Sequence, residues 1–452
     1  MNEASWVHAL RAQLAPCPVE TDPDILASFS RDQAPLAPAG TASALVRARS
    51  LEDVTRTLSF AHERRIPVVT RAAGTGLAGG ANATDGCILL SVLNLNRILS
   101  IDTATRTAVV EPGVLNGTLA AEAAARGLFY APDPASRDIS TIGGNIATNA
   151  GGACCLKYGV TGDHVAALKV VLPDGTLLRT GAITSKNVAG LDLTRLLVGS
   201  EGTLAVTVEA TVRLLRAPRP ASTLIAFFDT LDDAASAIVA MDASAELSLL
   251  EIMDRVTLSA VEDLVHMQLD TTAAAVVIAQ SDAPDAPDAI VRCAQLCAEH
   301  RARDLATTDD PAEGRLLLAA RRMALPALEK LGTTLLDDVA VPQPAIPEMM
   351  RRITAVAERS GLTIGTFGHA GDGNLHPTIV FRPEQHAAAL AAFDAIVRGA
   401  VELGGTISGE HGVGSLKRDY LSTMLGPAER ALLGRIKTAF DPHGILNPGK
   451  AI

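Results

Sequence analysis

The chain has 452 residues, 48% of them hydrophobic, which excludes a fibrous or disordered protein and predicts two or three folded domains. A formal net charge of −11 without a basic run argues against nucleic acid as a partner. No stretch approaches the ~18 apolar residues of a membrane span, and the first twenty residues carry no secretory or lipid-anchor signal, so we expect a cytoplasmic protein, peripheral to the inner membrane at most.

The first half of the chain alternates helices with short strands. Residues 50–66 open with Ser50 and Asp53, a helix-capping pattern, and keep a helical period. Strands are expected at IPVVT, CILLSV and RTAVVEPG, a helix at NGTLAAEAAARG, and a hairpin around Asp174 and Gly175 in AALKVVLPDGTLLRTG. After the strand-rich GTLAVTVEATVRLL, the linker-like RAPRPAS predicts a domain boundary near residue 217.

The second half has a pattern typical of helices layered on a mostly antiparallel sheet. Strands are predicted at TLIAFFDT and AAAVVIAQSD, and helices at LDDAASAIVAM and DAIVRCAQLCAEHRA. The helix that begins at PAEGRLL is expected to kink or end at Pro326. Six cysteines without a C-x-x-C spacing indicate reduced thiols, and Cys293 and Cys297, one helical turn apart, fit core packing better than a metal clip.

The segment GTGLAG, from Gly74 to Gly79, fits the G-x-G-x-x-G fingerprint of nicotinamide-dinucleotide folds. In those folds the third glycine opens a helix whose N-terminus holds the pyrophosphate. Here turn formers and the strand CILLSV follow instead, and Asp102, which mimics the ribose-binding acid in spacing, lies two segments further on. We therefore interpret the glycines as a strand-loop-strand whose bare backbone wraps an anion. A plain surface loop is the alternative.

A second cluster, YAPDPASRDISTIGGNIATNAGGACCLKYG at 130–159, is rich in small residues and too long for an ordinary connection. Such a segment can run beside a large flat ligand. Together with the first loop and LLVGSEGTLAVTVEAT, it resembles the FAD-binding domain of the vanillyl-alcohol oxidase / p-cresol methylhydroxylase superfamily over residues 38–216.

This resemblance implies that the first loop cradles the pyrophosphate, that the Pro-Asp-Pro and T-I-G-G-N segments line the flavin and ribityl, and that G-S-E-G-T-L closes on the adenine side. The FAD-binding residues so implied are Gly74, Thr75, Gly76, Leu77, Gly79, Gly80, Pro132, Asp133, Pro134, Thr141, Gly143, Gly144, Asn145, Asn149, Glu201, Gly202 and Val206. Some relatives bind flavin covalently through a His or Cys. Because the first loop has neither, we expect non-covalent FAD.

The segment TFGHAGDGNLHPTIV carries two histidines around a glycine-rich turn. If the Asp-Gly pair at 372–373 forms a two-residue hairpin, His369 lies directly opposite His376, with Cβ atoms about 5 Å apart on one face. Two imidazoles at that separation can bind one ion at roughly 2.1 Å each, and Glu410 in GTISGEHGVG offers a third ligand. Two solvated surface histidines are the alternative. The surrounding glycines and the second glycine-rich segment, with its Glu-His pair, favour the metal.

Glu410 and His411 are neighbours, which in an extended chain point to opposite faces. Glu410 can then bind a metal while His411 faces a substrate. A metal ion on a substrate hydroxyl lowers its pKa, and an imidazole can take the proton as a hydride leaves the same carbon for flavin N5. This chemistry suits oxidation of an α-hydroxy acid to an α-keto acid.

The segments GHAGDGNLH, SGEHGVG and FDPHGILNPGK together resemble the C-terminal domain of FAD-linked 2-hydroxy-acid dehydrogenases. That branch holds D-lactate dehydrogenases, D-2-hydroxyglutarate dehydrogenases and the flavin subunit of glycolate oxidase, and the resemblance now covers nearly the whole chain. It implies a divalent metal, zinc or manganese, on His369, His376 and Glu410, and His411 as the catalytic base.

The same resemblance implies that Arg321, or its neighbour Arg322, binds the substrate carboxylate by a bidentate fork. Asn447 is expected to return to the FAD domain and touch the cofactor. One departure concerns specificity, because the 2-hydroxyglutarate branch carries a lysine shortly before its D-x-x-x-P segment, where this chain has Leu336. An apolar residue there favours a short monocarboxylate such as D-lactate or glycolate.

We thus expect an α+β chain in three parts. These are a two-subdomain FAD-binding domain of the vanillyl-alcohol oxidase / p-cresol methylhydroxylase type at 1–217 (core 38–217), a ferredoxin-like α+β cap domain for substrate and metal at 218–412, and a C-terminal helical segment at 413–452 that returns to the FAD domain.

The expected reaction is FAD-dependent, metal-assisted oxidation of a D-2-hydroxy acid resembling D-lactate, with electrons passed to a quinone, a cytochrome or an electron-transfer flavoprotein. We expect a homodimer or a subunit of a complex. The open alternatives are the flavin subunit of a glycolate oxidase complex, a D-2-hydroxyglutarate dehydrogenase and, from another class, a metal-dependent hydrolase whose glycine loops bind only a substrate phosphate.

Overall fold

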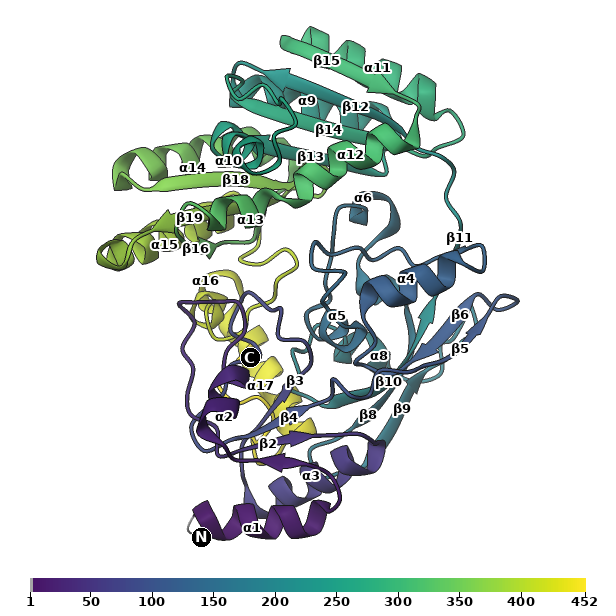
Figure 1. The fold of residues 1–452 in the computed structure, drawn as a ribbon, viewed down its shortest axis with the longest axis vertical. Coiled ribbons are helices and arrows are strands. Elements are labelled where there is room, and N and C mark those ends of the chain that lie inside the picture. The colour runs from purple at the N-terminus through teal and green to yellow at the C-terminus, as the bar shows by residue number, and fades with distance from the viewer. Residues whose placement is uncertain (1–2) are drawn as a thin grey trace. The chain divides into compact units, whose positions relative to one another are not determined.

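The computed structural model describes residues 3–452, which fold into two compact units (Figure 1). The first unit combines Met1–Gly151, Gly159–Ala217 and Glu410–Ile452, and the second combines Gly152–Tyr158 and Pro218–Gly409. This division differs from the expected one in two places. Residues 152–158 belong to the second unit rather than to the FAD-binding domain, and residues 410–412 belong to the first unit rather than to the cap.

The first unit contains a four-stranded sheet of order β1-β2-β4-β3, in which β2, β4 and β3 are parallel and β1 is antiparallel. Its strands are β1 (Val19–Glu20), β2 (Ala44–Arg47), β3 (Val68–Arg71) and β4 (Ile88–Ser91). The helices beside it are α1 (Glu3–Leu14), α2 (Pro23–Phe29) and α3 (Leu51–Arg64). Helix α3 begins as predicted, because the Ser50 side chain accepts a hydrogen bond from the Asp53 backbone N–H. Its buried residues Leu58 and Phe60 then join the core under the sheet.

A second sheet of the first unit is antiparallel throughout, with order β5-β6-β10-β8-β9. Its strands are β5 (Ile98–Asp102), β6 (Thr107–Val110), β8 (Val165–Val171), β9 (Leu177–Gly181) and β10 (Val206–Arg213), and a separate pair joins β7 (Leu128–Phe129) to β11 (Leu215–Arg216). Helices α4 (Asn116–Ala124), α5 (Ile142–Thr148), α7 (Thr161–His164) and α8 (Leu193–Leu197) complete this part. The predicted β8–β9 hairpin is confirmed, with Gly175 at φ +88° in its turn.

The last stretch of the chain completes the first unit. It contains η4 (Arg418–Tyr420), α16 (Leu421–Met424) and α17 (Pro427–Phe440). Beyond α17, Leu446 forms a parallel bridge to Val68 of β3, and Ile445 and Leu446 are buried in the same core as α3. The first unit therefore needs residues from both ends of the chain.

The second unit is built on one antiparallel sheet of eight strands. The order is β15-β12-β14-β13-β18-β19-β16, with the short β17 also paired to β19. The strands are β12 (Ser222–Phe228), β13 (Leu249–Asp254), β14 (Ala275–Ser281), β15 (Ala302–Thr308), β16 (Thr333–Leu336), β17 (Val339–Ala340), β18 (Thr363–His369) and β19 (Asn374–Phe381). The order of the first four strands is that of a ferredoxin-like βαββαβ unit, with one helix inserted between β13 and β14.

Helices cover this sheet in two groups (Figure 1). The first group is α9 (Leu231–Ser244), α11 (Ala286–Glu299), α14 (Ile346–Ser360) and α15 (His386–Glu402). The second group is α10 (Arg255–Val265), α12 (Pro311–Arg322) and α13 (Ala324–Glu329). Short turns of helix occur at α6 (Cys155–Tyr158), η1 (Gln343–Ala345), η2 (Ala370–Asp372) and η3 (Pro383–Gln385). A Cβ on Gly365 of β18 would meet Leu328 of α13 and Thr257 of α10, so the second group lies over the sheet face that bears Gly365.

The break in the long predicted helix lies earlier than expected. The helix is interrupted at Met323, between α12 and α13, and Pro326 lies within the first turn of α13. A proline is tolerated in a first turn because its missing N–H would have no partner there. Cys293 and Cys297 of α11 are fully buried, and Cys297 Sγ lies 3.6 Å from Met241 Sδ, as core packing predicts.

Residues 152–158 make an excursion from the first unit and are held to the second unit by ion pairs and by packing. Lys157 pairs with Asp282 at 2.7 Å and with Glu246 at 2.8 Å. A Cβ on Gly371 would meet Leu156 Cδ2 at 2.5 Å, so Leu156 packs closely against this glycine. These contacts explain why a stretch flanked by the first unit belongs to the second.

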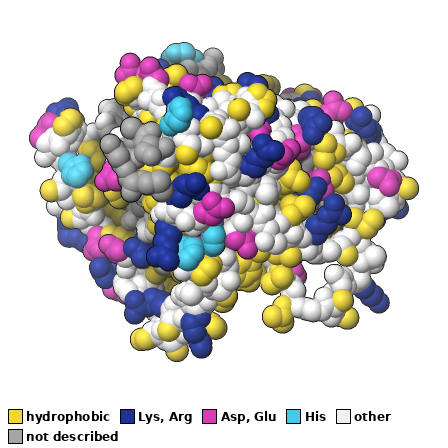
Figure 2. Space-filling view, turned by 90° about the horizontal axis from the view of Figure 1, so that it is seen from below, with side chains coloured by type: hydrophobic (Ala, Val, Ile, Leu, Met, Phe, Trp, Pro, Cys, Tyr) yellow, Lys and Arg dark blue, Asp and Glu magenta, His cyan; other side chains and the backbone are white. Residues whose placement is uncertain are grey.

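The surface agrees with the composition. Figure 2 shows Lys and Arg side chains interspersed with Asp and Glu on the face in view, without separation by sign. None of the helices in the described part of the chain has both the length and the apolar character needed to cross a membrane.

Candidate active site

The first loop expected to bind a cofactor lies between the parallel strands β3 and β4, and the strand β4, not a helix, follows it. Gly74 has φ +76° and Gly79 has φ +77°, a region that side chains disfavour. A Cβ on Gly79 would also lie 2.6 Å from Ala37 Cβ, and one on Gly74 would collide with the Arg71 guanidinium. The loop therefore has to present bare backbone. Because a strand and not a helix follows it, the loop is not the phosphate-binding turn of a nicotinamide-dinucleotide fold.

Residues near the C-terminus hold this loop in place by hydrogen bonds. Asn447 donates to the Gly80 carbonyl at 3.0 Å and to the Glu201 carbonyl at 2.6 Å. The Glu201 carboxylate accepts the backbone N–H groups of Val413 and Gly414 at 2.7 and 2.8 Å. Burial raises the pKa of Glu201 against the opposing effect of these hydrogen bonds. Sequence reasoning found Glu201 and Asn447 but not the hydrogen bonds that join them to the loop and to the last residues.

Lys450 is a buried cation that the sequence analysis missed. Its ammonium donates to the Asn82 carbonyl and, at 3.0 Å, to Asn447 Oδ1. Burial lowers its pKa to about 8, although Cys87, Asp32 and Glu201 act in the opposite direction. A lysine in the terminal NPGK run, beside a residue already assigned to the cofactor, was the signal that could have found it.

The segment at 130–159, rich in small residues, is partly helical. Thr141 caps α5 by accepting the Gly144 N–H at 3.2 Å, and Asn149 ends the helix in the left-handed conformation. A Cβ on Gly143 would lie 2.5 Å from Pro112 Cβ, so this glycine allows close packing. Ahead of the helix, Asn116 Nδ2 holds the Pro132 carbonyl at 3.1 Å.

All the sequence-predicted FAD residues lie within the first unit. They group in four places: the β3–β4 loop (Gly74, Thr75, Gly76, Leu77, Gly79, Gly80), the segment from β7 to the end of α5 (Pro132, Asp133, Pro134, Thr141, Gly143, Gly144, Asn145, Asn149), the turn before β10 with the first residue of that strand (Glu201, Gly202, Val206), and Asn447 near the C-terminus.

The histidine pair lies on the β18–β19 hairpin of the second unit, and its predicted register is wrong. His369 pairs with Asn374 and His376 pairs with Phe367, because residues 370–373, including a 3₁₀ turn, separate the strands. His376 is therefore diagonal to His369 rather than opposite. Both still lie on one face, since the shift is by two residues, and the ring centroids are 5.2 Å apart at 86°.

A buried carboxylate joins His369 to the expected substrate arginine. Glu251 of β13 pairs in register with His369, and its Oε1 lies 2.6 Å from His369 Nδ1. Its Oε2 lies 2.7 Å from Arg321 Nη2 at the end of α12, and the two side chains are only 1% and 8% exposed. Burial alone would raise the pKa of Glu251, but Arg321 and His369 outweigh it and lower that pKa.

Arg321, not Arg322, is the inward arginine. Arg322 is exposed, whereas Arg321 is buried with its guanidinium 4.7 Å from the Phe367 ring centroid. Arg321 Nε is buried without a hydrogen-bond partner among the described residues. An unsatisfied buried guanidinium N–H suits a carboxylate ligand.

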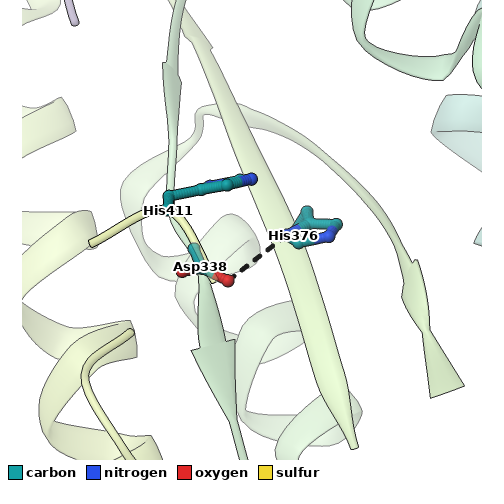
Figure 3. A group of neighbouring side chains, drawn as sticks. All are labelled: Asp338, His376 and His411. Atoms are coloured by element: carbon teal, nitrogen blue, oxygen red, sulfur yellow. Dashed lines mark ion pairs between the residues drawn. The ribbon is translucent and has the colours of Figure 1, made fainter. Parts of the chain in front are cut away.

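His376 also has a carboxylate beside it. Asp338 Oδ1 lies 3.7 Å from His376 Nδ1, the contact drawn as a dashed line in Figure 3. Asp338 is in turn held by Asn374 Nδ2 at 2.7 Å and by Ser408 Oγ at 2.8 Å. Neither Glu251 nor Asp338 was predicted as a site residue, although an acid inside the apolar run LLEIM is a detectable signal.

Glu410 and His411 do not follow the predicted arrangement. They lie in a bend rather than an extended strand, next to Gly412 at φ +88°. Glu410 Oε1 lies 3.6 Å from His411 Nε2. The expectation of opposite faces is therefore wrong, because the glycines that flank the pair bend the chain.

Two family models cover most of the chain. The model described as FAD linked oxidases, C-terminal domain, matches residues 217–451, and the model described as FAD binding domain matches residues 42–181. The chain belongs to the FAD-linked oxidases. It is thus an FAD-linked oxidoreductase, and the metal-dependent hydrolase alternative is wrong.

Named relatives agree on the chemistry at a coarse level. A glycolate oxidase subunit GlcD of Bacillus subtilis is 42% identical over 90% of this chain and 88% of its own length. A D-lactate dehydrogenase of Anaerostipes hadrus is 35% identical over 97% of this chain and 95% of its own length. These similarities support FAD-linked oxidation of a hydroxy acid.

Solved structures support the fold alone. p-Cresol methylhydroxylase with substrate bound superposes with a TM-score of 0.82 at 18% identity, over 99% of this chain and 96% of that one. The expected FAD-binding fold with a second domain is therefore confirmed.

The residues present fit FAD. Bare backbone is required at Gly74 and Gly79, as a pyrophosphate cradle needs. Arg71 Nη1 and Asn145 Nδ2 are buried donors without hydrogen-bond partners in the described part of the chain. Both donors suit a cofactor rich in phosphate and carbonyl oxygens.

Proposed function

We propose that this FAD-linked oxidoreductase oxidises a short D-2-hydroxy acid, of the D-lactate type, to the 2-oxo acid with the help of a divalent metal. The observation that carries the proposal is the buried row Arg321–Glu251–His369, with the His376 imidazole 5.2 Å from that of His369. It combines a carboxylate-binding arginine and two metal-binding imidazoles on one sheet face. A 2-hydroxy acid needs both, because its carboxylate and hydroxyl are on adjacent carbons.

The metal would be held by His369, His376 and Glu410. Two imidazoles and one carboxylate make a donor set that suits zinc or manganese. The ligand set is supported by the donors of the β18–β19 hairpin, and Glu410 follows directly on Gly409, the last residue of the second unit. A divalent ion there would lower the pKa of a bound hydroxyl.

The proposed roles divide between three side chains and the flavin. Arg321 binds the substrate carboxylate and fixes the position of the reacting carbon. His411 takes the hydroxyl proton as the catalytic base. Bound FAD, held non-covalently, supplies the hydride acceptor.

An apolar side chain favours a small substrate. Leu336 pairs with Thr378, so it shares a sheet face with His376 two residues away, and it is buried. A second carboxylate would find no cation at that position. D-2-Hydroxyglutarate is therefore a less favoured substrate than D-lactate or glycolate.

A second candidate function is the flavin subunit of a glycolate-oxidising complex. It is favoured by the GlcD subunits of Bacillus subtilis and Escherichia coli, 42% and 37% identical to this chain. In either case we propose a cytoplasmic enzyme that passes its electrons to a quinone, a cytochrome or an electron-transfer flavoprotein, as a homodimer or within a complex.

The test is anaerobic mixing of the purified yellow protein with a panel of D- and L-2-hydroxy acids. We expect D-lactate or glycolate to bleach the flavin and L-lactate to leave it oxidised. If D-lactate bleaches the flavin of this chain in the absence of other proteins, partner subunits are not needed for the reaction. A flavin that no hydroxy acid bleaches, with or without added zinc or manganese, contradicts both candidate functions.

A further inference from the structure

Glu251 occupies a position where an isolated carboxylate is costly. It lies in the middle of β13, in the sequence LLEIMD, and is 1% exposed. Burying a carboxylate is unfavourable unless its oxygens are paired. Its two oxygens have different partners, His369 Nδ1 at 2.6 Å and Arg321 Nη2 at 2.7 Å, which come from β18 and α12.

The contact with His369 fixes which ring nitrogen is exposed to a ligand. Because Nδ1 lies against the carboxylate, it carries the ring proton, and Nε2 presents its lone pair. The contact at His376 is looser, because Asp338 Oδ1 lies 3.7 Å from its Nδ1, beyond hydrogen-bond distance. Of the two candidate metal ligands, His369 is therefore the one whose ring a carboxylate orients directly, with its Nε2 left for an ion.

Glu251 differs from Asp338 in what its second oxygen does. The second oxygen of Asp338 accepts from Ser408 Oγ, whereas the second oxygen of Glu251 contacts the guanidinium of Arg321. That guanidinium also lies over the Phe367 ring, 4.7 Å from its centroid. Movement of the Glu251 carboxylate would therefore displace an imidazole and an arginine together.

We infer that Glu251 is a positioning residue that presets the His369 imidazole for a divalent metal and the Arg321 guanidinium for a substrate carboxylate. The inference rests on the proposed function, because it assigns these two partners the roles proposed above. It adds that the metal site and the carboxylate site are coupled through one side chain. A structural role, in which Glu251 only neutralises the buried Arg321, predicts no effect on metal binding.

The first variant is Glu251→Gln. The substitution replaces one of the two carboxylate oxygens with an NH₂ group, which can only donate. The remaining oxygen can accept from His369 or from Arg321, so one of the two contacts is lost. We expect Zn²⁺ affinity, titrated calorimetrically into the metal-depleted FAD holoenzyme, to fall about 10- to 100-fold, as for other outer partners of metal-binding histidines. KM for the hydroxy acid that bleaches the wild-type flavin should rise more than kcat falls.

A charge-balanced comparison guards against a variant that fails to fold. Arg321→Met alone keeps the Glu251–His369 contact and should not weaken Zn²⁺ binding. The double variant Glu251→Leu/Arg321→Met replaces both buried charges with apolar side chains of similar size, a change that buried ion pairs often tolerate. It should bind Zn²⁺ about 10- to 100-fold more weakly than Arg321→Met does. Asp254→Asn, in the same strand, should bind Zn²⁺ as the wild type does.

The outcomes separate this inference from the proposed function. Equal Zn²⁺ affinity of Arg321→Met and the double variant overturns the positioning role while leaving the proposed metal site intact. A wild-type enzyme that binds no Zn²⁺ or Mn²⁺ overturns the proposed metal site, and the inference with it. A selective loss of Zn²⁺ affinity whenever Glu251 is replaced supports the inference.

Discussion

The imidazole of His376 stands at 86° to that of His369, with ring centroids 5.2 Å apart across the β18–β19 hairpin. If both bind one ion, loss of either should empty the site. We expect His376→Ala to lower affinity for zinc or manganese by more than about 100-fold, a larger loss than removal of an outer partner causes. Elemental analysis after dialysis measures the metal, and the visible spectrum should show that FAD is retained.

Exposed His386 at the start of α15 provides the matched control for that experiment. His386→Ala removes an imidazole from the same unit and should leave metal content unchanged. Undiminished metal in His376→Ala would refute the proposed ligand set.

His411 is the proposed catalytic base. His411→Asn keeps a polar side chain but cannot take a proton near neutral pH, so kcat should fall about 10²- to 10⁴-fold. FAD content and metal content should both stay at the wild-type level, because neither role is assigned to this imidazole. A variant with normal turnover would exclude His411 as the base.

The glycine loop allows a comparison of two similar substitutions. Gly79→Ala places a Cβ 2.6 Å from Ala37 Cβ at a positive φ, whereas Gly86→Ala has a similar φ of +73° with no atom within 4 Å. Both substitutions carry the backbone strain, but only the first crowds the cradle, at a cost of about 1–3 kcal/mol. We expect Gly79→Ala to purify with little FAD and Gly86→Ala to keep it, measured as the ratio of flavin to protein absorbance.

Asp254 should make stability depend on pH. Burial raises its pKa to about 6, against hydrogen bonds from Thr257 and Thr366 that lower it. Because the folded state then holds a proton that the unfolded state has lost, this contribution is present below pH 4 and disappears as pH rises through 6. The free-energy difference is about 3 kcal/mol by the usual conversion.

Asp254→Asn removes that titration. Urea unfolding of both proteins between pH 4 and pH 8 should show the wild type losing stability relative to the variant as pH rises, with the change centred between the two pKa values. A parallel pH dependence of the two proteins would contradict a raised pKa.

Local signals in the sequence predicted much of the fold. The Ser50 cap, the β8–β9 hairpin and the strand after the first glycine loop follow from short-range rules that act within a few residues. The register of the histidine hairpin was wrong by two residues, because the Asp-Gly signal at 372–373 lies at the end of a longer turn. The face was still right, since a shift of two residues preserves alternation.

The partners of the site residues could not be derived in the same way. Glu251 and His369 are 118 residues apart, and their pairing depends on β13 lying beside β18 in the sheet. No local rule orders strands across such a distance. Glu251 could have been suspected as an acid between apolar residues of a strand, but its partners could be identified only from the order of the strands.

The excursion at 152–158 and the return at 410–452 make both units discontinuous in sequence. During synthesis, Val68 of β3 cannot form its bridge to Leu446 until nearly the whole polypeptide has left the ribosome. The same holds for the hydrogen bond from Asn447 to the Gly80 carbonyl. A gene fragment cut at the junction after Ala217 would therefore encode an open core with an unfastened loop. Truncation to the amino-terminal piece should yield an aggregating product without colour rather than a small flavodomain.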